Sequence, residues 1–192
     1  MKAAKSVCEG LESINCFIRL DLNSVGVICV WGERMTEEHY AYLLIEDEKW
    51  WNRRINKNRL GNEVHSFVRK GKVGPKEAQQ LLFYMKRPAK RIRGTAEFLE
   101  RVTGTSDELW QLHGPETVFE SRDEYDSFVG GRSTVTFIRF KNMEELQQPI
   151  DFNTISIGIG IGKMPQGGKY LSRETVNSVI KTELKQHDTV TA

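Results

Sequence analysis

The stretch Leu81-Leu-Phe-Tyr-Met-Lys86, followed closely by Ile92-Arg-Gly-Thr-Ala-Glu97, decides the fold class of this chain. The first stretch is an apolar run of strand length, and it predicts a strand over Gln80–Lys86. The second alternates apolar or small residues with polar ones, which is typical of a half-buried strand, here Arg91–Val102. Gly94 inside that strand predicts a bend or bulge of the kind that closes small barrels.

Further strands and helices are predicted on both sides of this pair. Capping boxes at Thr105-Ser-Asp-Glu108 and Ser121-Arg-Asp-Glu124 each predict the start of a short acidic helix. A closing helix is expected over Tyr170–Lys185, capped by Ser172. Residues 49–63 are basic and weakly periodic, which indicates a surface loop or a short helix. Short apolar runs rich in β-branched residues predict the remaining strands, which are Val25–Trp31, Val64–Val68, Ser133–Phe140 and Ile155–Gly162.

The strands are scattered among short helices, and this order predicts an α+β fold rather than a doubly wound sheet. We expect a small mixed β-barrel with flanking helices. The 192 residues are enough for one domain with its own core. Residues 1–24 are expected to form an N-terminal arm, residues 25–185 the domain itself, and residues 186–192 a flexible C-terminal tail.

The composition excludes several classes of protein. With 39% hydrophobic and 28% charged residues, the chain is neither disordered nor fibrous, and no apolar run is long enough to span a bilayer. The N-terminal residues lack the apolar core of a signal peptide. Cys8, Cys16 and Cys29 occur without a CxxC pair, so reduced thiols in a cytoplasmic protein are expected, with a Cys8–Cys16 disulfide as the alternative. No metal and no cofactor is expected.

The net charge of +2 conceals a strong segregation of charge along the chain. Residues 49–93 carry fourteen Lys or Arg and two Asp or Glu, a net charge of +12, whereas residues 94–129 carry two and nine, a net charge of −7. A segment this basic either meets a polyanion or folds against acidic segments of the same chain. Aromatic residues interleaved with the basic ones favour a nucleic acid, because arginine binds phosphate and aromatic rings stack on bases. The acidic segment would then face away from the nucleic acid or bind a protein partner.

This interpretation assigns phosphate contacts to the cations of the segment and base stacking to its aromatic residues. Gly94 and the glycines near residue 167 would let a base edge approach the backbone. The predicted nucleic-acid-binding residues are Trp50, Trp51, Arg53, Arg54, Lys57, Arg59, Phe67, Arg69, Lys70, Lys72 and Gly94.

Signals for catalysis are weaker. The run Gly158-Ile-Gly-Ile-Gly162-Lys163 lacks the spacing of a dinucleotide or phosphate loop and indicates a strand, and no GxSxG nucleophile motif occurs. His113 precedes a helix-ending glycine, where a structural cap is the simpler role. His65 is expected on the surface. Glu97 would act as a general base only if it faced a pocket, and an exposed carboxylate on a strand is the simpler interpretation.

The order of these motifs resembles the PUA-like superfamily, which includes the ASCH and EVE domains. The resemblance starts with the aromatic strand and the two quoted stretches, from Ser66 to Glu97. It continues through Trp110-Gln-Leu-His-Gly114, Glu120-Ser-Arg-Asp-Glu-Tyr125 and Val135-Thr-Phe-Ile-Arg-Phe140. Gly167-Gly-Lys-Tyr-Leu171 is similar to the closing segment of uncharacterised archaeal members.

The resemblance covers roughly residues 25–180 and implies a small pseudo-barrel with a cleft that holds RNA, a modified base or a nucleotide. The chain is therefore expected to be a cytoplasmic, archaeal RNA-binding protein rather than an enzyme. Some ASCH proteins resemble amidohydrolases or nucleases that use a Lys, a Thr and a Glu. This implies an alternative, a hydrolase of a modified nucleoside or RNA, for which the chain offers Lys86 or Lys90, Thr95 and Glu97. A protein-interaction module is the third hypothesis.

Overall fold

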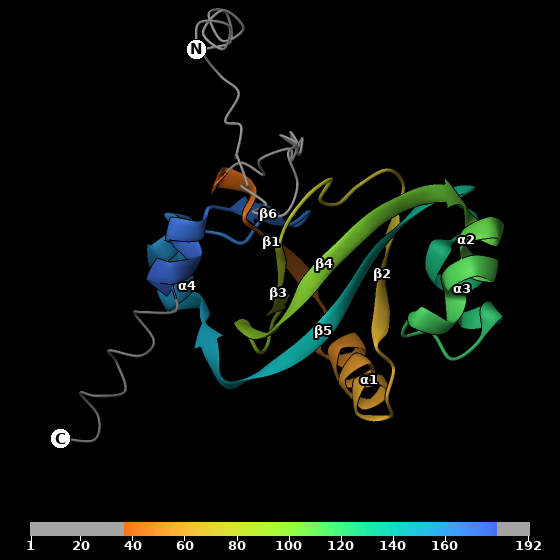
Figure 1. Ribbon diagram of the computed structural model, residues 1–192, viewed down its shortest axis with the longest axis horizontal. Helices are drawn as coiled ribbons and strands as arrows, with labels where there is room; N and C mark the ends of the chain where they lie inside the picture. Colours follow the sequence, from red (N-terminus) through yellow and green to blue (C-terminus); the bar gives the residue numbers. More distant parts are fainter. Residues whose placement is uncertain (1–36, 180–192) are drawn as a thin grey trace, which may run out of the picture. The chain divides into compact units, whose positions relative to one another are not determined.

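The structure is a computed structural model that describes residues 37–179 (Figure 1). These residues combine a mixed sheet with short helices, so the predicted α+β class is confirmed. The three cysteines, the strand expected at Val25–Trp31, the N-terminal arm and the C-terminal tail lie outside the described residues. None of the helices within residues 37–179 has the length and apolar character needed to cross a membrane.

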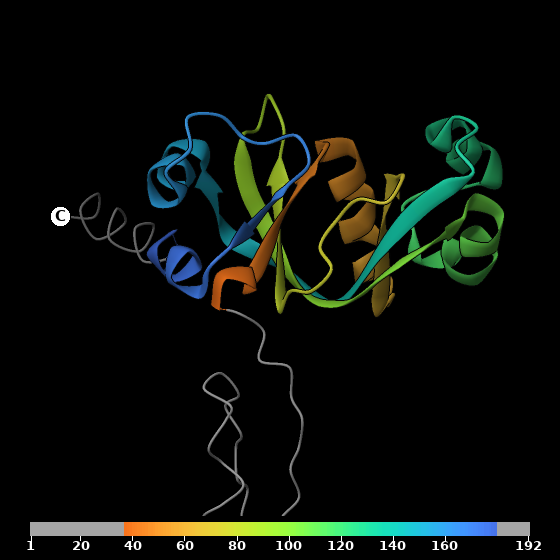
Figure 2. The same ribbon diagram turned by 90° about the horizontal axis from the view of Figure 1, so that it is seen from above.

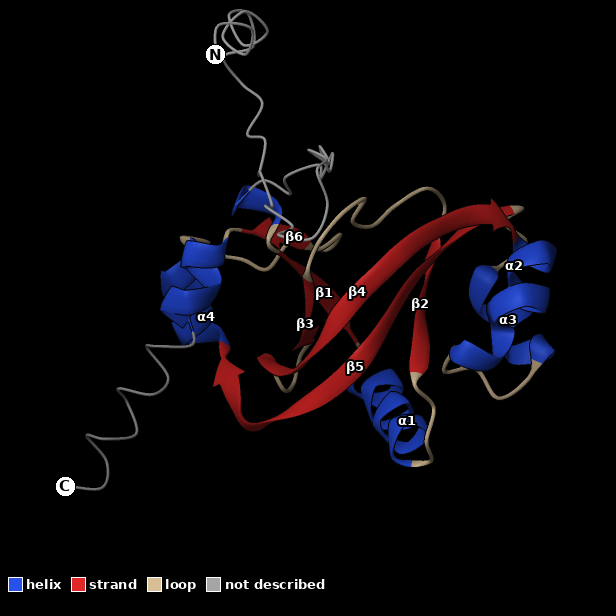
Figure 3. Ribbon diagram, viewed as in Figure 1, coloured by secondary structure: helices blue, strands red, loops and turns tan. Residues whose placement is uncertain are grey.

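Within residues 37–179, six strands form a single mixed sheet (Figure 3). They are β1 (Ala41–Glu46), β2 (Val64–Lys70), β3 (Gln80–Met85), β4 (Arg91–Thr105), β5 (Thr134–Asp151) and β6 (Lys169–Leu171). Their order in the sheet is β2-β5-β4-β3-β1-β6. Strands β1 and β3 are parallel, which the long connection through α1 and β2 permits, and the other neighbouring pairs are antiparallel.

The helices lie around this sheet in separate groups. Within the described residues they are η1 (Glu37–His39), α1 (Glu48–Arg59), α2 (Ser106–His113), η2 (Gly114–Glu116), α3 (Arg122–Val129) and α4 (Phe152–Ile159). A further helical segment runs over residues 173–179. The pair α2 and α3 lies at one end of the sheet and α4 at the other, with α1 between them (Figures 1 and 2).

Each group of helices buries its own apolar cluster against the strands. Trp51 and Ile55 of α1 join the cluster on one part of the sheet. Leu109 of α2 and Tyr125 of α3 join a second cluster at the far end of β4 and β5. Ile155 of α4 joins a third cluster with residues of β1, β3 and the last helical segment. The position of α1 is thus fixed by burial of its apolar side, which matters for the charges on it.

The helix starts predicted from capping boxes are confirmed. The hydroxyl of Thr105 accepts a hydrogen bond from the backbone N–H of Glu108 at 3.3 Å, and that of Ser121 accepts one from Glu124 at 3.2 Å. Ser172 caps the last helical segment in the same way. That segment starts later than predicted, because the residues before Ser172 pair with β1 as strand β6.

The irregularity predicted at Gly94 is also confirmed, but its purpose differs from the expected one. The pairing of β4 with β5 shifts register between Ile92 and Gly94. A Cβ atom on Gly94 would lie 2.3 Å from Cη2 of Trp51 and 2.5 Å from the carbonyl oxygen of Glu144. The absence of a side chain therefore makes room for α1 against the sheet, and Gly94 offers no open backbone to a base.

One prediction of local structure is wrong and another is incomplete. The strand expected at Ile155–Gly162 is helix α4, which ends at Gly160 in the left-handed conformation with φ 67°. A short apolar run alone does not separate a buried strand from a helix. A Cβ atom on Gly158 would lie 2.7 Å from Cγ2 of Val179, so this glycine serves close helix packing. The segment expected as a surface loop or short helix, residues 49–63, contains most of α1, which has a buried side.

Candidate functional site

Helix α1 carries many of the basic residues, and several are paired within the chain. Nη1 of Arg53 donates to both carboxylate oxygens of Glu124, at 2.7 and 2.8 Å, and Nε of Arg53 lies 3.3 Å from Glu120. Nζ of Lys57 donates to the carbonyl oxygen of Thr117 at 2.5 Å. The acidic segment therefore folds against the basic one, which was the alternative to the binding of a polyanion by the basic segment.

Arg54, on the inner side of α1, is a buried structural residue. Its side chain is 1% exposed, and its Nη2 donates to Oε1 of Glu46 at 2.7 Å. Its Nη1 donates to the carbonyl oxygen of Ser66 at 3.2 Å. Burial raises the pKa of Glu46, and the adjacent guanidinium of Arg54 opposes this rise. The pair joins α1 to the end of β1 and to β2, and Arg54 has no free donor group at the surface for a phosphate.

A cavity of about 320 Å³ opens where β1 ends and α1 begins. We name it the aromatic cavity, because rings from four parts of the chain form much of its wall: Trp50 of α1, Phe67 of β2, Phe119 after η2, and Phe128 of α3. Charged side chains lie among these rings, namely Glu46, Asp47, Arg54, Arg69, Lys70 and Lys86. The cavity thus combines flat apolar surfaces with charged groups of both signs.

Cations lie close to the faces of three of these rings, and over Trp50 these are Lys49 and Arg53, at 4.7 and 5.0 Å from the ring centroid. Cζ of Arg69 is 4.9 Å from the centroid of the Phe67 ring, and Nζ of Lys70 is 5.0 Å from that of Phe128. Such distances are those of cation–π contacts. Aromatic surfaces beside basic groups are the usual means by which proteins hold single-stranded nucleic acids.

Three buried polar atoms of residues that line the aromatic cavity have no hydrogen-bond partner within residues 37–179. They are Oε2 of Glu46 and Nη2 of Arg69, and Nε of Arg54 is a third such atom. Burial lowers the pKa of Arg69, and Tyr42 and Glu46 oppose this fall, so the two charged groups are near enough to affect each other. A buried polar group without a partner costs about 1–3 kcal/mol. A ligand that donates to Glu46 and accepts from Arg69 would remove that cost.

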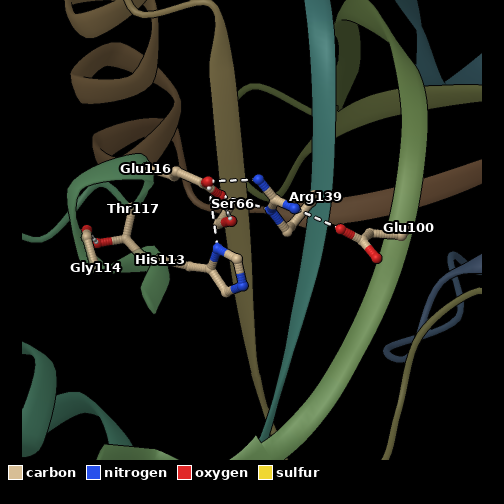
Figure 4. Close-up of polar contacts among 7 residues, drawn as sticks. All are labelled: Ser66, Glu100, His113, Gly114, Glu116, Thr117 and Arg139. Atoms are coloured by element: carbon tan, nitrogen blue, oxygen red, sulfur yellow. Dashed lines mark hydrogen bonds and ion pairs between the residues drawn. The ribbon is translucent and has the colours of Figure 1, made fainter. Parts of the chain in front are cut away.

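A polar network surrounds Glu116, which lies three residues before Phe119 in the chain (Figure 4). The carboxylate of Glu116 accepts hydrogen bonds from Oγ of Ser66 and Nη2 of Arg139, both at 2.6 Å, and lies 3.3 Å from Nδ1 of His113. Burial favours a higher pKa for Glu116, but the hydrogen bonds from Arg139 and Ser66 outweigh it and the pKa is lowered. The ionised carboxylate thereby ties η2 to β2 and β5, and it sets the course of the chain into the cavity wall.

The predicted nucleic-acid-binding residues fall into distinct groups. In the wall of the aromatic cavity lie Trp50, Phe67, Arg69 and Lys70, together with the buried Arg54. Paired within the chain are Arg53, Lys57 and Arg59, the last with Glu145 at 2.9 Å. Trp51 is fully buried over Gly94, so it presents no face to a base, and Lys72 is exposed outside the cavity. The structure thus brings some of the predicted nucleic-acid-binding residues together in the wall of the aromatic cavity.

The residues considered for catalysis do not come together. Nζ of Lys86 forms an ion pair with Asp47 at 3.0 Å, beyond the last residue of β3. Glu97 lies opposite Gln80, the first residue of β3, and Thr95 pairs two residues further along. Since a strand rises about 3.3 Å per residue, roughly 20 Å of chain separates the levels of Lys86 and Glu97. Within residues 37–179, moreover, no group of His, Cys, Asp and Glu side chains could hold a metal ion.

His65 was expected on the surface, but it is fully buried beneath α1. Its Nε2 lies 3.1 Å from Oδ1 of Asn58, and its ring stacks on that of Phe140. Burial lowers the pKa of His65 to about 4, and Arg54 acts in the same direction. His65 is therefore neutral near pH 7 and has a structural role.

Three important residues of the aromatic cavity were not predicted, namely Glu46, Phe119 and Phe128. A signal for Glu46 does exist, because a carboxylate that ends the apolar run before Asp47 would need a buried partner. No comparable signal marks Phe119 and Phe128, which lie in the acidic segment and reach the cavity only through the packing of α2 and α3 on the sheet.

Comparison with known proteins supports the fold. No protein-family model matches the chain, and no curated protein matches it. Among solved structures, an ASCH protein from Zymomonas mobilis matches with 17% identity and a TM-score of 0.62, over 74% of this chain and 95% of that chain. Two variants of that protein match with 18% identity and TM-scores of 0.62 and 0.61, over 76% and 73% of this chain and 97% and 96% of theirs.

This likeness shows that the chain shares the fold of the ASCH protein from Zymomonas mobilis. The fold implied by the sequence resemblance is therefore confirmed. The matched structures give no support to a link with archaeal members.

Proposed function

We propose that this chain binds single-stranded nucleic acid, RNA in the first place, and that the aromatic cavity receives one unpaired base. The observation that carries the proposal is that Glu46 and Arg69, whose atoms are two of the three unpartnered ones, line a cavity walled by aromatic rings. A base is a flat aromatic group with hydrogen-bonding atoms on its edge, and this cavity matches both properties.

The apolar part of the cavity suits stacking. Its volume of about 320 Å³ lies at the lower end of the range typical of ligand pockets, which favours a small flat group over a large one. Stacking of a base on an aromatic side chain contributes about 1–3 kcal/mol. Trp50, Phe67, Phe119 and Phe128 supply rings from separate parts of the chain, so the cavity exists only in the folded protein.

The polar part of the cavity suits a particular kind of base edge. The carboxylate of Glu46 accepts a hydrogen bond, whereas the guanidinium of Arg69 donates one. Guanine and uracil both carry an N–H group next to a carbonyl oxygen on their pairing edges, and adenine does not. We therefore propose a preference for guanine or uracil, or for a modified base that keeps this edge.

The test is binding of a fluorescein-labelled, random-sequence single-stranded RNA of twelve nucleotides to wild type and to Arg69→Gln. The matched control is Arg132→Gln, which removes an exposed arginine outside the cavity. Hydrogen bonds to charged groups contribute about 1.5–3 kcal/mol, so Arg69→Gln should weaken binding roughly tenfold or more. Arg132→Gln should change the affinity little, and affinity should fall with increasing salt.

Equal affinities for the two variants, with both as stable as wild type, would contradict the placement of the base. Absence of RNA binding by wild type at low salt would contradict the proposed function as a whole. The hydrolase alternative is not favoured by a specific observation, because Lys86 and Lys90 both lie near the end of β3 that is farther from Glu97.

A further inference from the structure

We propose that a second cavity, next to the aromatic one, is an anion subsite for a phosphate of the nucleotide whose base occupies the aromatic cavity. This inference rests on the proposed function and adds a second ligand group to it. The second cavity has a volume of about 880 Å³ and lies between the loop that joins β3 to β4 and the chain that follows α4. We name it the basic cavity.

The cations of the basic cavity give it an excess of positive charge. They are Lys86, Arg87, Lys90 and Lys163, and Asp47 is the sole carboxylate in the wall. Asp47 forms an ion pair with Lys86 at 3.0 Å. Arg87, Lys90 and Lys163 have no carboxylate within ion-pair distance among residues 37–179. Cations crowded together without a counter-ion repel one another, and an anionic ligand would relieve that repulsion.

The two cavities adjoin, because both are lined by Ile45, Asp47 and Lys86. These residues lie at the end of β1 and just beyond the end of β3, so both cavities open at the same edge of the parallel pair. A ligand with a flat aromatic group joined to an anionic group could occupy both. A nucleotide has this composition, with its base for the aromatic cavity and its phosphate for the basic cavity.

The basic cavity also has an apolar part that suits the rest of a nucleotide. Tyr84 and Phe152 line it, with ring centroids 6.4 Å apart. Arginine can bind a phosphate through two parallel hydrogen bonds, and lysine acts as a point charge. Arg87 and Lys163 come from two separate segments that line the cavity, the β3–β4 loop and the chain after α4, so a phosphate bound to both would join these segments.

The experiment compares ligands with and without the phosphate. The probes are the four ribonucleosides and their 5′- and 3′-monophosphates, titrated into the full-length chain and followed by NMR chemical shifts. The test variant is Arg87→Gln/Lys163→Gln, and the matched control is Lys76→Gln/Arg132→Gln, which removes two exposed cations that line neither cavity. Aromatic side-chain resonances report whether each variant keeps the fold.

For the preferred base, wild type and control should bind one of the two monophosphates about tenfold or more tightly than the nucleoside. The test variant should bind the nucleoside as wild type does and lose the gain from the phosphate. With single-stranded RNA, it should also flatten the dependence of log affinity on log salt by about 0.7, the contribution of one phosphate.

If nucleosides bind but neither phosphate increases affinity, the anion subsite is rejected and the base site stands. The same holds if the gain persists in the test variant. If neither nucleosides nor RNA bind wild type, the proposed function and this inference are both rejected. Binding of an acidic peptide, poly-glutamate, in preference to every nucleotide would also overturn the inference, since a protein partner would then occupy the basic cavity.

Discussion

Helix α1 and several cations at the two cavities belong to the same basic segment, yet their charges have different environments. On α1, Arg53, Arg54 and Arg59 each form an ion pair with a glutamate. At the cavities, Lys70 and Arg87 have no carboxylate within ion-pair distance in the described part of the chain. The basic segment thus divides into a part neutralised by the fold and a part available to a ligand.

This difference shows that a count of charges along a sequence does not locate a binding surface. Two hypotheses were considered for the basic segment: that it binds a polyanion, and that its cations form ion pairs within the chain. The structure supports pairing for α1, and it leaves unpaired cations at the cavities for a polyanion. Variants on the two sides of this division should therefore behave differently, in stability on one side and in binding on the other.

The largest effect is expected for Arg54→Met. It would leave the carboxylate of Glu46 buried without its partner, and loss of one member of a buried ion pair costs about 3–5 kcal/mol. The free energy of unfolding at pH 7, from urea titration, should fall by that amount.

The double variant Glu46→Leu/Arg54→Met serves as the control for this prediction. It removes both charges, so most of the lost stability should return, because replacing a buried pair by apolar residues is often neutral. If Arg54→Met alone lowered the free energy of unfolding by less than about 1 kcal/mol, the contribution of an exposed ion pair, the Glu46–Arg54 pair would not be buried in solution.

The second prediction concerns the pH dependence of stability that results from His65, which is buried beneath α1. Its pKa is about 4 in the folded chain and its ordinary value is 6.5, so protonation favours the unfolded chain. The stabilisation by neutral His65 is complete above pH 6.5 and is lost as the pH falls toward 4, by up to about 3 kcal/mol. Urea titrations of wild type and His65→Gln from pH 7.5 to 4.5 measure the difference.

Subtracting the pH dependence of the stability of His65→Gln from that of wild type removes the contribution of the other titrating groups. Wild type should lose about 2–3 kcal/mol more than His65→Gln over this interval. If wild type and His65→Gln lost the same free energy of unfolding over this interval, His65 would be exposed to solvent rather than buried beneath α1.

Features set by neighbouring residues were predictable from the sequence. The capping boxes at Thr105 and Ser121 form because donor and acceptor lie three residues apart, and the bulge at Gly94 follows from one residue without a side chain. Arg53 and Glu124, in contrast, are 71 residues apart, and no local pattern selects one glutamate of the acidic segment as the partner.

The candidate site was predictable in part for the same reason. Phe67, Arg69 and Lys70 lie within four residues of one another on β2, so the aromatic residue beside basic ones indicated a surface there. Phe119 and Phe128 reach the cavity through the packing of two helices on a distant part of the sheet. The strand expected at Ile155–Gly162 fails for another reason, since both a helix and a strand bury such a run.

The smallest effects are expected for the exposed end of α1, where Arg59 was predicted to contact phosphate. Its side chain is 68% exposed, and an exposed pair such as Arg59–Glu145 contributes about 0–1 kcal/mol. Arg59→Ala should therefore change neither stability nor RNA affinity appreciably, whereas Lys70→Ala, at the aromatic cavity, should lower affinity and flatten the salt dependence. Both are measured with the same fluorescent RNA. If Arg59→Ala flattened the salt dependence more than Lys70→Ala, the nucleic acid would contact α1 rather than the aromatic cavity. Arg59 would then leave Glu145 for a phosphate, and this contact would release counter-ions as the contact of a free cation does.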